Sequence, residues 1–172
     1  MYYFKHIFFL LFLTIPFSIT NAQIREFTHP KIISFEHSTD PVTAGKNSKV
    51  SLSNKHYKHL GHSLQWNWDK PNAQIFINQP IGYLSQNPNP KETSLSTFIF
   101  WIYNPKAISS GKLKFEFLKQ GKVCSWFEYG MNFTGWSGAW LIFNRDMQGT
   151  PEEGMDELRI TAPNTNYGEI FL

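Results

Sequence analysis

Residues 112–133 read KLKFEFLKQGKVCSWFEYGMNF, with apolar side chains at every second position on both sides of a central KQGK. Apolar residues alternate with charged ones from Leu113 to Phe117, and a second alternation runs from Val123 to Phe133. A period of two is typical of strands with one buried face, and a short glycine-bearing break is typical of a hairpin. The stretch therefore predicts two antiparallel strands, with Glu116 on the outward side.

Shorter alternating stretches lie before and after this hairpin. They are SLQWNW (63–68), QIFIN (74–78), GAWLIFN (138–144), MDELRITAP (155–163) and GEIFL (168–172). No segment keeps a helical period over three turns, and turn residues separate the strands at near-regular spacing. The pattern predicts one all-β domain, an antiparallel β-sandwich.

Residues 96–104, STFIFWIYN, are apolar at both odd and even positions. A strand that is buried on both faces has this composition, so we expect it at the centre of its sheet. The preceding residues 80–94, PIGYLSQNPNPKETS, are rich in proline and asparagine and predict a long loop.

The chain begins MYYFKHIFFLLFLTIPFSITNAQ, which has the form of a secretory signal. Lys5 supplies the positive start, an apolar run follows, and Thr20 and Ala22 fit a cleavage site. A membrane anchor is the alternative, but Pro16 interrupts a run already shorter than the ~20 residues of a span. We expect residues 1–22 to be removed, leaving a secreted bacterial domain, 23–172, in the periplasm or at the cell surface, with no membrane span.

Charge and cysteine content exclude several classes of function. Loss of residues 1–22 takes one lysine from the 16 basic residues and none of the 13 acidic ones, leaving 15 against 13. Such a balance does not favour nucleic acid, although it allows a polyanionic sugar as partner. Cys124 is the only cysteine, which excludes an internal disulfide and a CxxC zinc site.

Common catalytic and metal motifs are missing from the sequence. It contains no G-x-S-x-G, Walker loop, G-x-G-x-x-G or H-E-x-x-H. His56, His59 and His62 are spaced for one face of a helix, where they could hold a metal. Gly61 and the strand that follows favour a turn with solvated histidines instead.

Aromatic residues make up 17% of the chain and are candidates for sugar binding. A flat indole stacks on the C–H face of a pyranose, and neighbouring polar groups orient its hydroxyls. The alternative is that these residues belong to the core. The candidates are Trp101, Tyr103, Trp126, Trp136 and Trp140.

Five blocks occur in an order that resembles the N-terminal domain of chondroitin sulfate ABC lyases, in the hyaluronate and chondroitin polysaccharide lyase superfamily. The blocks are SLQWNW, STFIFWIYN, MNFTGW, NRDMQGTPEEGMDELRITAP and GEIFL. The resemblance runs from about Phe35 to Leu172. It implies a galactose-binding-like jelly roll that binds or positions substrate. The catalytic residues of such lyases lie in an α-helical toroid, and nothing in this chain corresponds to that toroid.

The sequence departs from the family pattern at two places. Ser137 stands where a basic residue commonly follows FTGW, which removes a guanidinium that could hold a carboxylate or sulfate. The family pattern continues past GEIFL with an aspartate, whereas the sequence stops at Leu172, so we expect a short final strand without a late acidic ligand. Jelly rolls of this kind often hold a structural calcium or sodium ion, and Glu36 is the best remaining oxygen ligand. A surface glutamate at a strand end is the equal alternative.

These observations predict a non-catalytic carbohydrate-binding module for a glycosaminoglycan: chondroitin sulfate, dermatan sulfate or hyaluronan. Its predicted contact residues are Trp136, Trp140, Trp101 and Tyr103, with Trp136 the first choice. The alternative is a fragment of a lyase in glycosaminoglycan degradation, whose toroid is encoded separately or was lost. A remnant without a function is the third interpretation.

Overall fold

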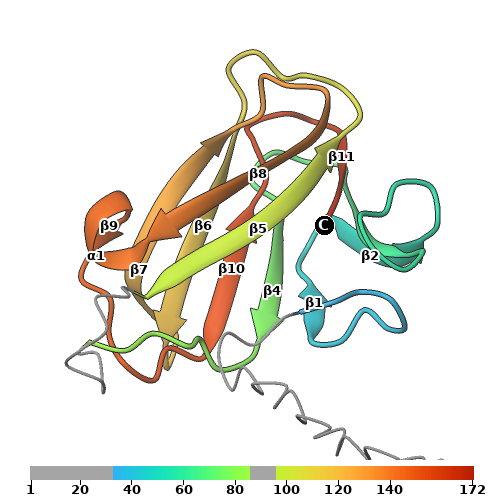
Figure 1. Cartoon of the computed structure of the whole chain (residues 1–172). Coiled ribbons are helices and arrows are strands. Elements are labelled where there is room, and N and C mark those ends of the chain that lie inside the picture. Colours follow the sequence, from blue (N-terminus) through green and yellow to red (C-terminus); the bar gives the residue numbers. More distant parts are fainter. Residues whose placement is uncertain (1–32, 86–95) are drawn as a thin grey trace, which may run out of the picture.

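The computed structural model describes residues 33–85 and 96–172, and within them the strands form two facing sheets (Figure 1). One sheet has six strands in the order β1-β4-β10-β6-β7-β9. They are β1 (Val42–Ala44), β4 (Gln74–Asn78), β6 (Lys112–Lys119), β7 (Lys122–Gly130), β9 (Gln148–Gly149) and β10 (Glu157–Thr161).

The second sheet has five strands among these residues, in the order β2-β3-β11-β5-β8. They are β2 (Ser48–Ser53), β3 (Ser63–Trp68), β5 (Thr97–Asn104), β8 (Gly135–Ile142) and β11 (Gly168–Phe171). One helical turn, α1 (Phe143–Asp146), follows β8.

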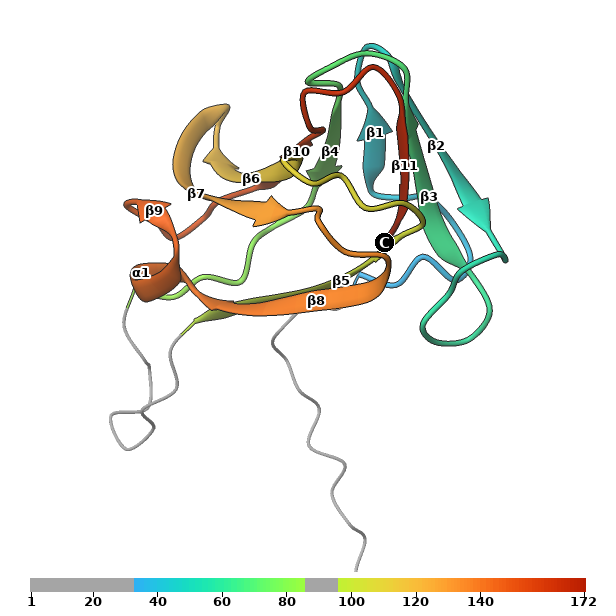
Figure 2. The same ribbon diagram turned by 90° about the horizontal axis from the view of Figure 1, so that it is seen from above.

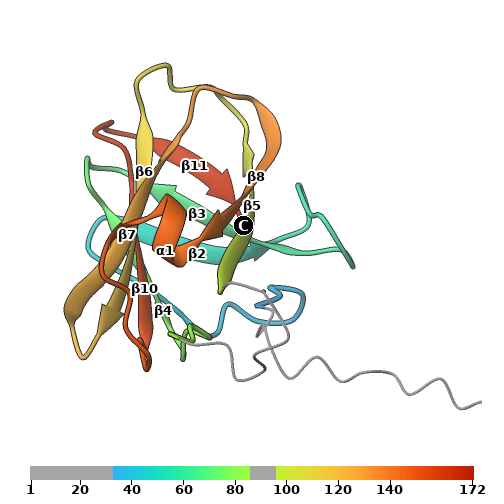
Figure 3. The same cartoon turned by 60° about the vertical axis from the view of Figure 1, so that its left-hand side comes forward.

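The chain passes repeatedly from one sheet to the other, and the strands pair antiparallel. Figure 2 shows β5 and β8 in one layer and β6 and β7 in the other, and Figure 3 shows the same separation from the side. This is an antiparallel jelly-roll β-sandwich, so the predicted fold class is confirmed.

The hairpin predicted from residues 112–133 forms, although its second strand ends at Gly130 and not at Phe133. Lys119 pairs with Lys122 across a two-residue turn. Gln120 and Gly121 both have positive φ, 51° and 79°, as a type I′ turn requires. This turn fixes the register of β6 and β7, and a shift after Phe117 adds one irregularity to the ladder.

Aromatic rings fill the space between the sheets. Phe115 of β6 stacks on Phe127 of β7 with ring centroids 4.6 Å apart. From the opposite sheet, Phe98 lies 5.0 Å from Phe117 and Phe100 lies 4.8 Å from Phe115, centroid to centroid. Burial of each large apolar side chain contributes about 1.5–3 kcal/mol. This core stabilises a domain whose only cysteine is a free thiol.

The outward side of β5 differs from the prediction for residues 96–104. β5 has neighbours on both edges, β11 and β8, as a central strand should. Its even-numbered residues face the core, but Ile99 and Trp101 on the other side are 50% and 48% exposed. The prediction of burial on both faces is therefore wrong, because the described residues place no second layer over this part of the sheet.

Glu116 projects from the outer side of β6, as predicted, and is nevertheless buried. Its carboxylate oxygens lie 2.7 Å from Nζ of Lys114 and 2.9 Å from Nε of Arg159. Burial opposes ionisation of this carboxyl group, but Arg159 and Lys114 outweigh it and lower the pKa of Glu116. Charged side chains thus cover part of the six-stranded sheet.

Two predicted segments fall outside the described structure. The signal peptide at 1–22 lies wholly outside it, and the loop at 80–94 is described only to residue 85, where no strand forms. Within the described ranges, no helix has the length and apolar character needed to cross a bilayer.

Gly168 is predicted to be essential for packing at the start of β11. A Cβ atom there would collide with the indole of Trp68, which is 3% exposed. We expect Gly168→Ala to displace this ring and lower the free energy of unfolding by about 1–3 kcal/mol, measured by urea denaturation. Gly130→Ala is the control, since its Cβ would have only Asn132 nearby, at 3.6 Å. Equal stability of the two variants would contradict the prediction.

Candidate functional site

Five side chains form a continuous apolar surface on the outer side of β5 and β8. The register places Ile99 opposite Trp140, Trp101 opposite Gly138 and Tyr103 opposite Trp136. Paired residues on a sheet point to the same side, and alternate residues share that side. The aromatic face, as we call it, consists of Ile99, Trp101, Tyr103, Trp136 and Trp140.

The aromatic face is accessible to a large ligand. Trp140 is 71% exposed and Trp101 48%, whereas Tyr103 and Trp136 are half-buried. Indoles of this exposure are unusual for residues that serve only in packing, because Trp is highly buried on average. All four predicted contact residues lie on this face, and the sugar-binding role assigned to them stays a prediction.

Gly138 allows Trp101 to lie flat on the neighbouring strand. A Cβ at this glycine would stand 2.8 Å from the Trp101 ring and 2.6 Å from the carbonyl oxygen of Phe100. Both distances are shorter than van der Waals contact, so any larger residue would push the indole away from the sheet. The glycine of the sequence G-A-W in β8 therefore gives the Trp101 ring room against the strand, and Trp140, two residues later, presents the more exposed ring for stacking on sugar.

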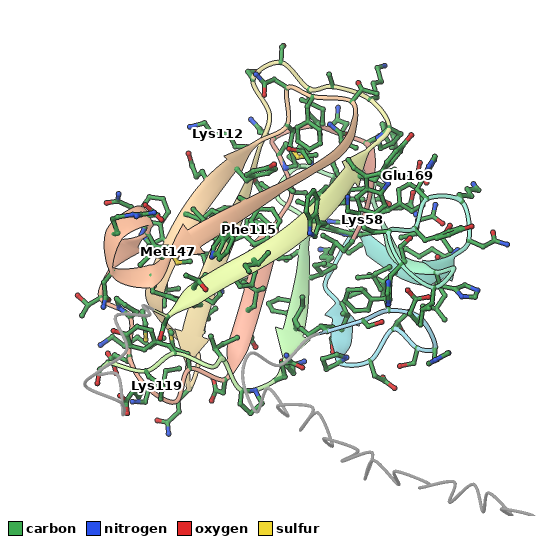
Figure 4. The ribbon with its side chains drawn as sticks, viewed as in Figure 1. Lys58, Lys112, Phe115, Lys119, Met147 and Glu169 are labelled. Carbon is green, nitrogen blue, oxygen red and sulfur yellow. The ribbon has the colours of Figure 1, made fainter. Side chains whose placement is uncertain are left out.

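The loop of residues 54–62, between β2 and β3, lies against one end of the aromatic face. His56 stacks on Tyr103 with ring centroids 3.8 Å apart and planes within 11°. Nζ of Lys58 stands 3.7 Å from the ring centroid of Trp101 and 5.7 Å from that of Trp136. Figure 4 shows Lys58 in front of β5, on the side away from Phe115 and the core.

Glu36 holds this loop in place. Its carboxylate oxygens accept the backbone N–H groups of Leu60 at 2.9 Å and His62 at 3.0 Å. Burial acts to raise the pKa of Glu36, but the N–H groups of His62 and Leu60, helped by nearby His59, outweigh it and lower that pKa. The hydroxyl group of Ser63 also donates to the carbonyl oxygen of His56.

The cation hypothesis for Glu36 is untested. Both of its oxygens already accept a backbone N–H, and residues 33–85 and 96–172 hold no group of three His, Cys, Asp or Glu side chains arranged for a metal. The histidines at 56, 59 and 62 lie in an irregular loop and not on a helix, as the turn interpretation predicts. A calcium or sodium ion at Glu36 stays a prediction that its surroundings do not favour.

For Trp126 and Ser137, the sequence did not predict which sheet or which side of the sheet each side chain occupies. Trp126 faces outward from β7 in the six-stranded sheet, where Nζ of Lys114 stands 5.1 Å from its ring centroid. Ser137 faces inward from β8, and its hydroxyl lies 2.6 Å from that of Tyr129. A basic residue at position 137 would therefore start from the side of β8 opposite Trp136 and Trp140. Trp136 itself lies within β8, which begins at Gly135 and not at Gly138 as predicted.

A cavity of about 860 Å³ lies at the end of the five-stranded sheet. Its wall includes Lys49, Asn67 and Glu169 from three neighbouring strands, and Tyr167, which is 76% exposed. Glu169 is two residues from Phe171, which pairs with Tyr103. The cavity and the aromatic face therefore share the outer side of this sheet.

The sequence of the chain is similar to a known protein family and to two curated enzymes. The family model "Lyase, N terminal" matches residues 29–172. A chondroitin sulfate ABC exolyase of Bacteroides thetaiotaomicron is 42% identical over 153 residues, which cover 88% of this chain and 15% of that protein. Another, from Proteus vulgaris, is 40% identical over 130 residues, with coverage of 76% and 12%. The chain thus spans less than one sixth of these curated relatives.

Among solved structures, the CBM22-1 xylan-binding domain of Xyn10C from Paenibacillus barcinonensis has a similar fold. The TM-score is 0.50 at 12% sequence identity, over 79% of this chain and 83% of that domain. At this identity the similarity concerns the fold, and it agrees with the jelly-roll architecture.

The lowered pKa of Glu36 predicts a pH-dependent contribution to stability. Since the pKa is lower in the folded state, the contribution is complete above the ordinary glutamate value of about 4.3 and is lost as pH falls through the lowered one. We expect Glu36→Gln to melt at a lower temperature than wild type at pH 7, with the difference shrinking towards pH 3, in thermal melts followed by circular dichroism.

Glu128→Gln serves as the control, because its carboxylate pairs with Lys112 at an exposed site, where ion pairs contribute little. A constant melting difference between Glu36→Gln and wild type at every pH would contradict the assignment.

Proposed function

Because the chain belongs to the lyase N-terminal family, whose relatives here are chondroitin sulfate ABC exolyases, we propose that it is a non-catalytic module that binds polysaccharide on its aromatic face. The family resemblance seen in the sequence is confirmed. The binding role is the proposal, and it is supported by the exposed indoles of the aromatic face.

One observation carries the proposal: Trp101 lies flat across Gly138, beside the 71% exposed indole of Trp140. A pyranose has apolar C–H faces, and stacking on an indole removes them from water while its hydroxyls stay solvated. Trp101 and Trp140 are diagonal neighbours on adjacent strands, and such neighbours stand about 7–8 Å apart. A polysaccharide that stacks on Trp140 would therefore pass beside Trp101, whose ring carries Nζ of Lys58 at 3.7 Å from its centroid.

We propose a glycosaminoglycan as the ligand: chondroitin sulfate, dermatan sulfate or hyaluronan. The support comes from two relatives at 40% identity or more whose names include chondroitin sulfate. Residues 54–62 beside the aromatic face add two lysines and no acidic residue, which suits a polyanion.

A second candidate function is part of a lyase that degrades glycosaminoglycans. It is favoured by the small share of the exolyases, 12–15% of their length, to which this chain corresponds. In that setting the module would hold the polymer beside the catalytic part. The chain alone should then release no unsaturated uronide from chondroitin sulfate in an ultraviolet absorbance assay, and release of product would overturn the non-catalytic assignment.

Export is also part of the proposal, on the strength of the apolar N-terminal stretch. Removal of residues 1–22 would place the module in the periplasm or at the cell surface, where polymeric glycosaminoglycans are accessible. Mass spectrometry of protein from the native host would test the cleavage site.

Substitution of the exposed tryptophans tests the binding site. We expect Trp140→Ala and Trp101→Ala each to weaken binding of chondroitin sulfate about tenfold, as loss of one stacking contact of about 1.4 kcal/mol would do. Binding is measured by isothermal titration calorimetry. The free energy of unfolding should change by less than about 1 kcal/mol in Trp140→Ala, whose ring is 71% exposed, and by more in Trp101→Ala, whose ring is 48% exposed and packs against Gly138.

Trp126→Ala is the matched control, since its ring faces outward from the other sheet. It should bind as wild type does. If Trp140→Ala and Trp101→Ala kept wild-type affinity, or if wild type bound no glycosaminoglycan at millimolar concentration, the proposed site would be wrong.

A further inference from the structure

The loop of residues 54–62, NKHYKHLGH, carries positive charge to the aromatic face. It contains two lysines and three histidines and no acidic residue. Of these, Lys58 comes closest to the exposed tryptophans, with Nζ 3.7 Å from the ring centroid of Trp101 and 5.7 Å from that of Trp136. A cation–π contact of this kind localises an ammonium group at a ring surface without neutralising its charge.

The charge of Lys58 is available to a ligand. Its side chain is exposed, and the ion pairs found among the described residues use Lys112, Lys114, Lys119, Arg145 and Arg159 as cations. Within the same part of the chain, no carboxylate lies within ion-pair distance of Lys58. An ammonium group held over an indole therefore faces solvent beside the platform formed by Trp140.

The loop is fixed before a ligand arrives. Glu36 accepts two N–H groups from residues that follow Lys58, and Ser63 donates to His56, which precedes it. His56 is itself stacked on Tyr103 and makes a T-shaped contact with Phe171. A side chain on a tethered loop loses less conformational entropy on binding than one on a free loop.

Lys58 and Trp140 are spaced for one acidic sugar. Trp140 pairs with Ile99 and is therefore a diagonal neighbour of Trp101, the ring that carries the ammonium; diagonal neighbours on adjacent strands stand about 7–8 Å apart. A pyranose stacked on Trp140 would thus direct a substituent over Trp101 towards Nζ. A carboxylate or sulfate there would form a charge-assisted hydrogen bond with the ammonium group.

We propose that Lys58 selects acidic over neutral sugars by binding a carboxylate or sulfate group of a chain stacked on the aromatic face, and that Glu36 is the positioning residue of its loop. The inference rests on the proposed function and adds the group that recognises charge. Lys58 thus takes the role that a basic residue at position 137 could have had in the family pattern, because Ser137 faces the opposite side of β8.

The experiment compares chondroitin sulfate, hyaluronan and chondroitin that has been desulfated and carboxyl-reduced, which keeps the backbone and removes the charge. Wild type, Lys58→Ala, Lys58→Arg and the control Lys122→Ala, on the six-stranded sheet, are titrated by calorimetry. We expect Lys58→Ala to bind chondroitin sulfate about tenfold more weakly and the neutral polymer as wild type does. Lys58→Arg and Lys122→Ala should resemble wild type, and the salt dependence of binding should be shallower for Lys58→Ala.

Hyaluronan identifies the anionic group. An equal loss for hyaluronan and chondroitin sulfate assigns the contact to the carboxylate, and a loss confined to chondroitin sulfate assigns it to the sulfate. Glu36→Gln is assayed well below its melting temperature. We expect it to bind the acidic polymers more weakly than wild type does and the neutral polymer equally well. A loss of folded protein would instead lower binding of both kinds of polymer.

The outcomes separate this inference from the proposed function. If Lys58→Ala binds chondroitin sulfate as wild type does while Trp140→Ala does not, the inference is wrong and the binding function stands. An equal loss of acidic and neutral binding in Lys58→Ala would make the lysine a packing residue and also overturn the inference. Wild type that binds none of the three polymers would overturn both.

Discussion

The candidate surface depends on the register between β5 and β8. Eight paired positions align the strands, so that Ile99, Trp101 and Tyr103 share a side with Trp136 and Trp140. A slip of one residue would turn these indoles into the core and bring Ser137 and Leu141 outward. The inner aromatic residues Phe98 and Phe100 oppose such a slip, because they pack against Phe115 and Phe117 of the facing sheet. The same core contacts that stabilise the sandwich thus define the aromatic face.

The second constraint is the tether from Glu36 to the loop between β2 and β3. The carboxylate accepts N–H groups from residues 24 and 26 positions later, so two distant parts of the chain are joined at an irregular segment. Backbone donors in loops must find partners, and a buried carboxylate is a strong acceptor. Without the tether the loop between the strands would lose its defined position, whereas its contacts with Tyr103 and Trp101 require that position.

The alternation of apolar and polar residues predicted most strands correctly, but it predicted the burial of their outward-facing side chains less well. The hairpin of residues 112–133 was predictable because its turn and its period of two are encoded in adjacent residues. The burial of Glu116 was not, because Arg159 reaches it from a strand more than forty residues away. Ile99 and Trp101 were expected inside, since an apolar residue indicates burial without revealing whether a second layer exists. Lys58 was missed, although a loop with two lysines and no acid was a visible signal.

The sequence by itself determined most of the strands from residue 63 onward, which side chains share a side of each of them, and the family to which the chain belongs; it did not reveal β1, β2 or β9. These properties follow from periodicity, turn residues and motif order, all of which are local. Only the tertiary structure decided which strands became neighbours. Trp126 and Trp136 were both candidates for sugar binding, yet one lies on the six-stranded sheet and the other beside Lys58. That difference arises from pairing and packing between segments far apart in the chain, whose energies depend on the whole fold.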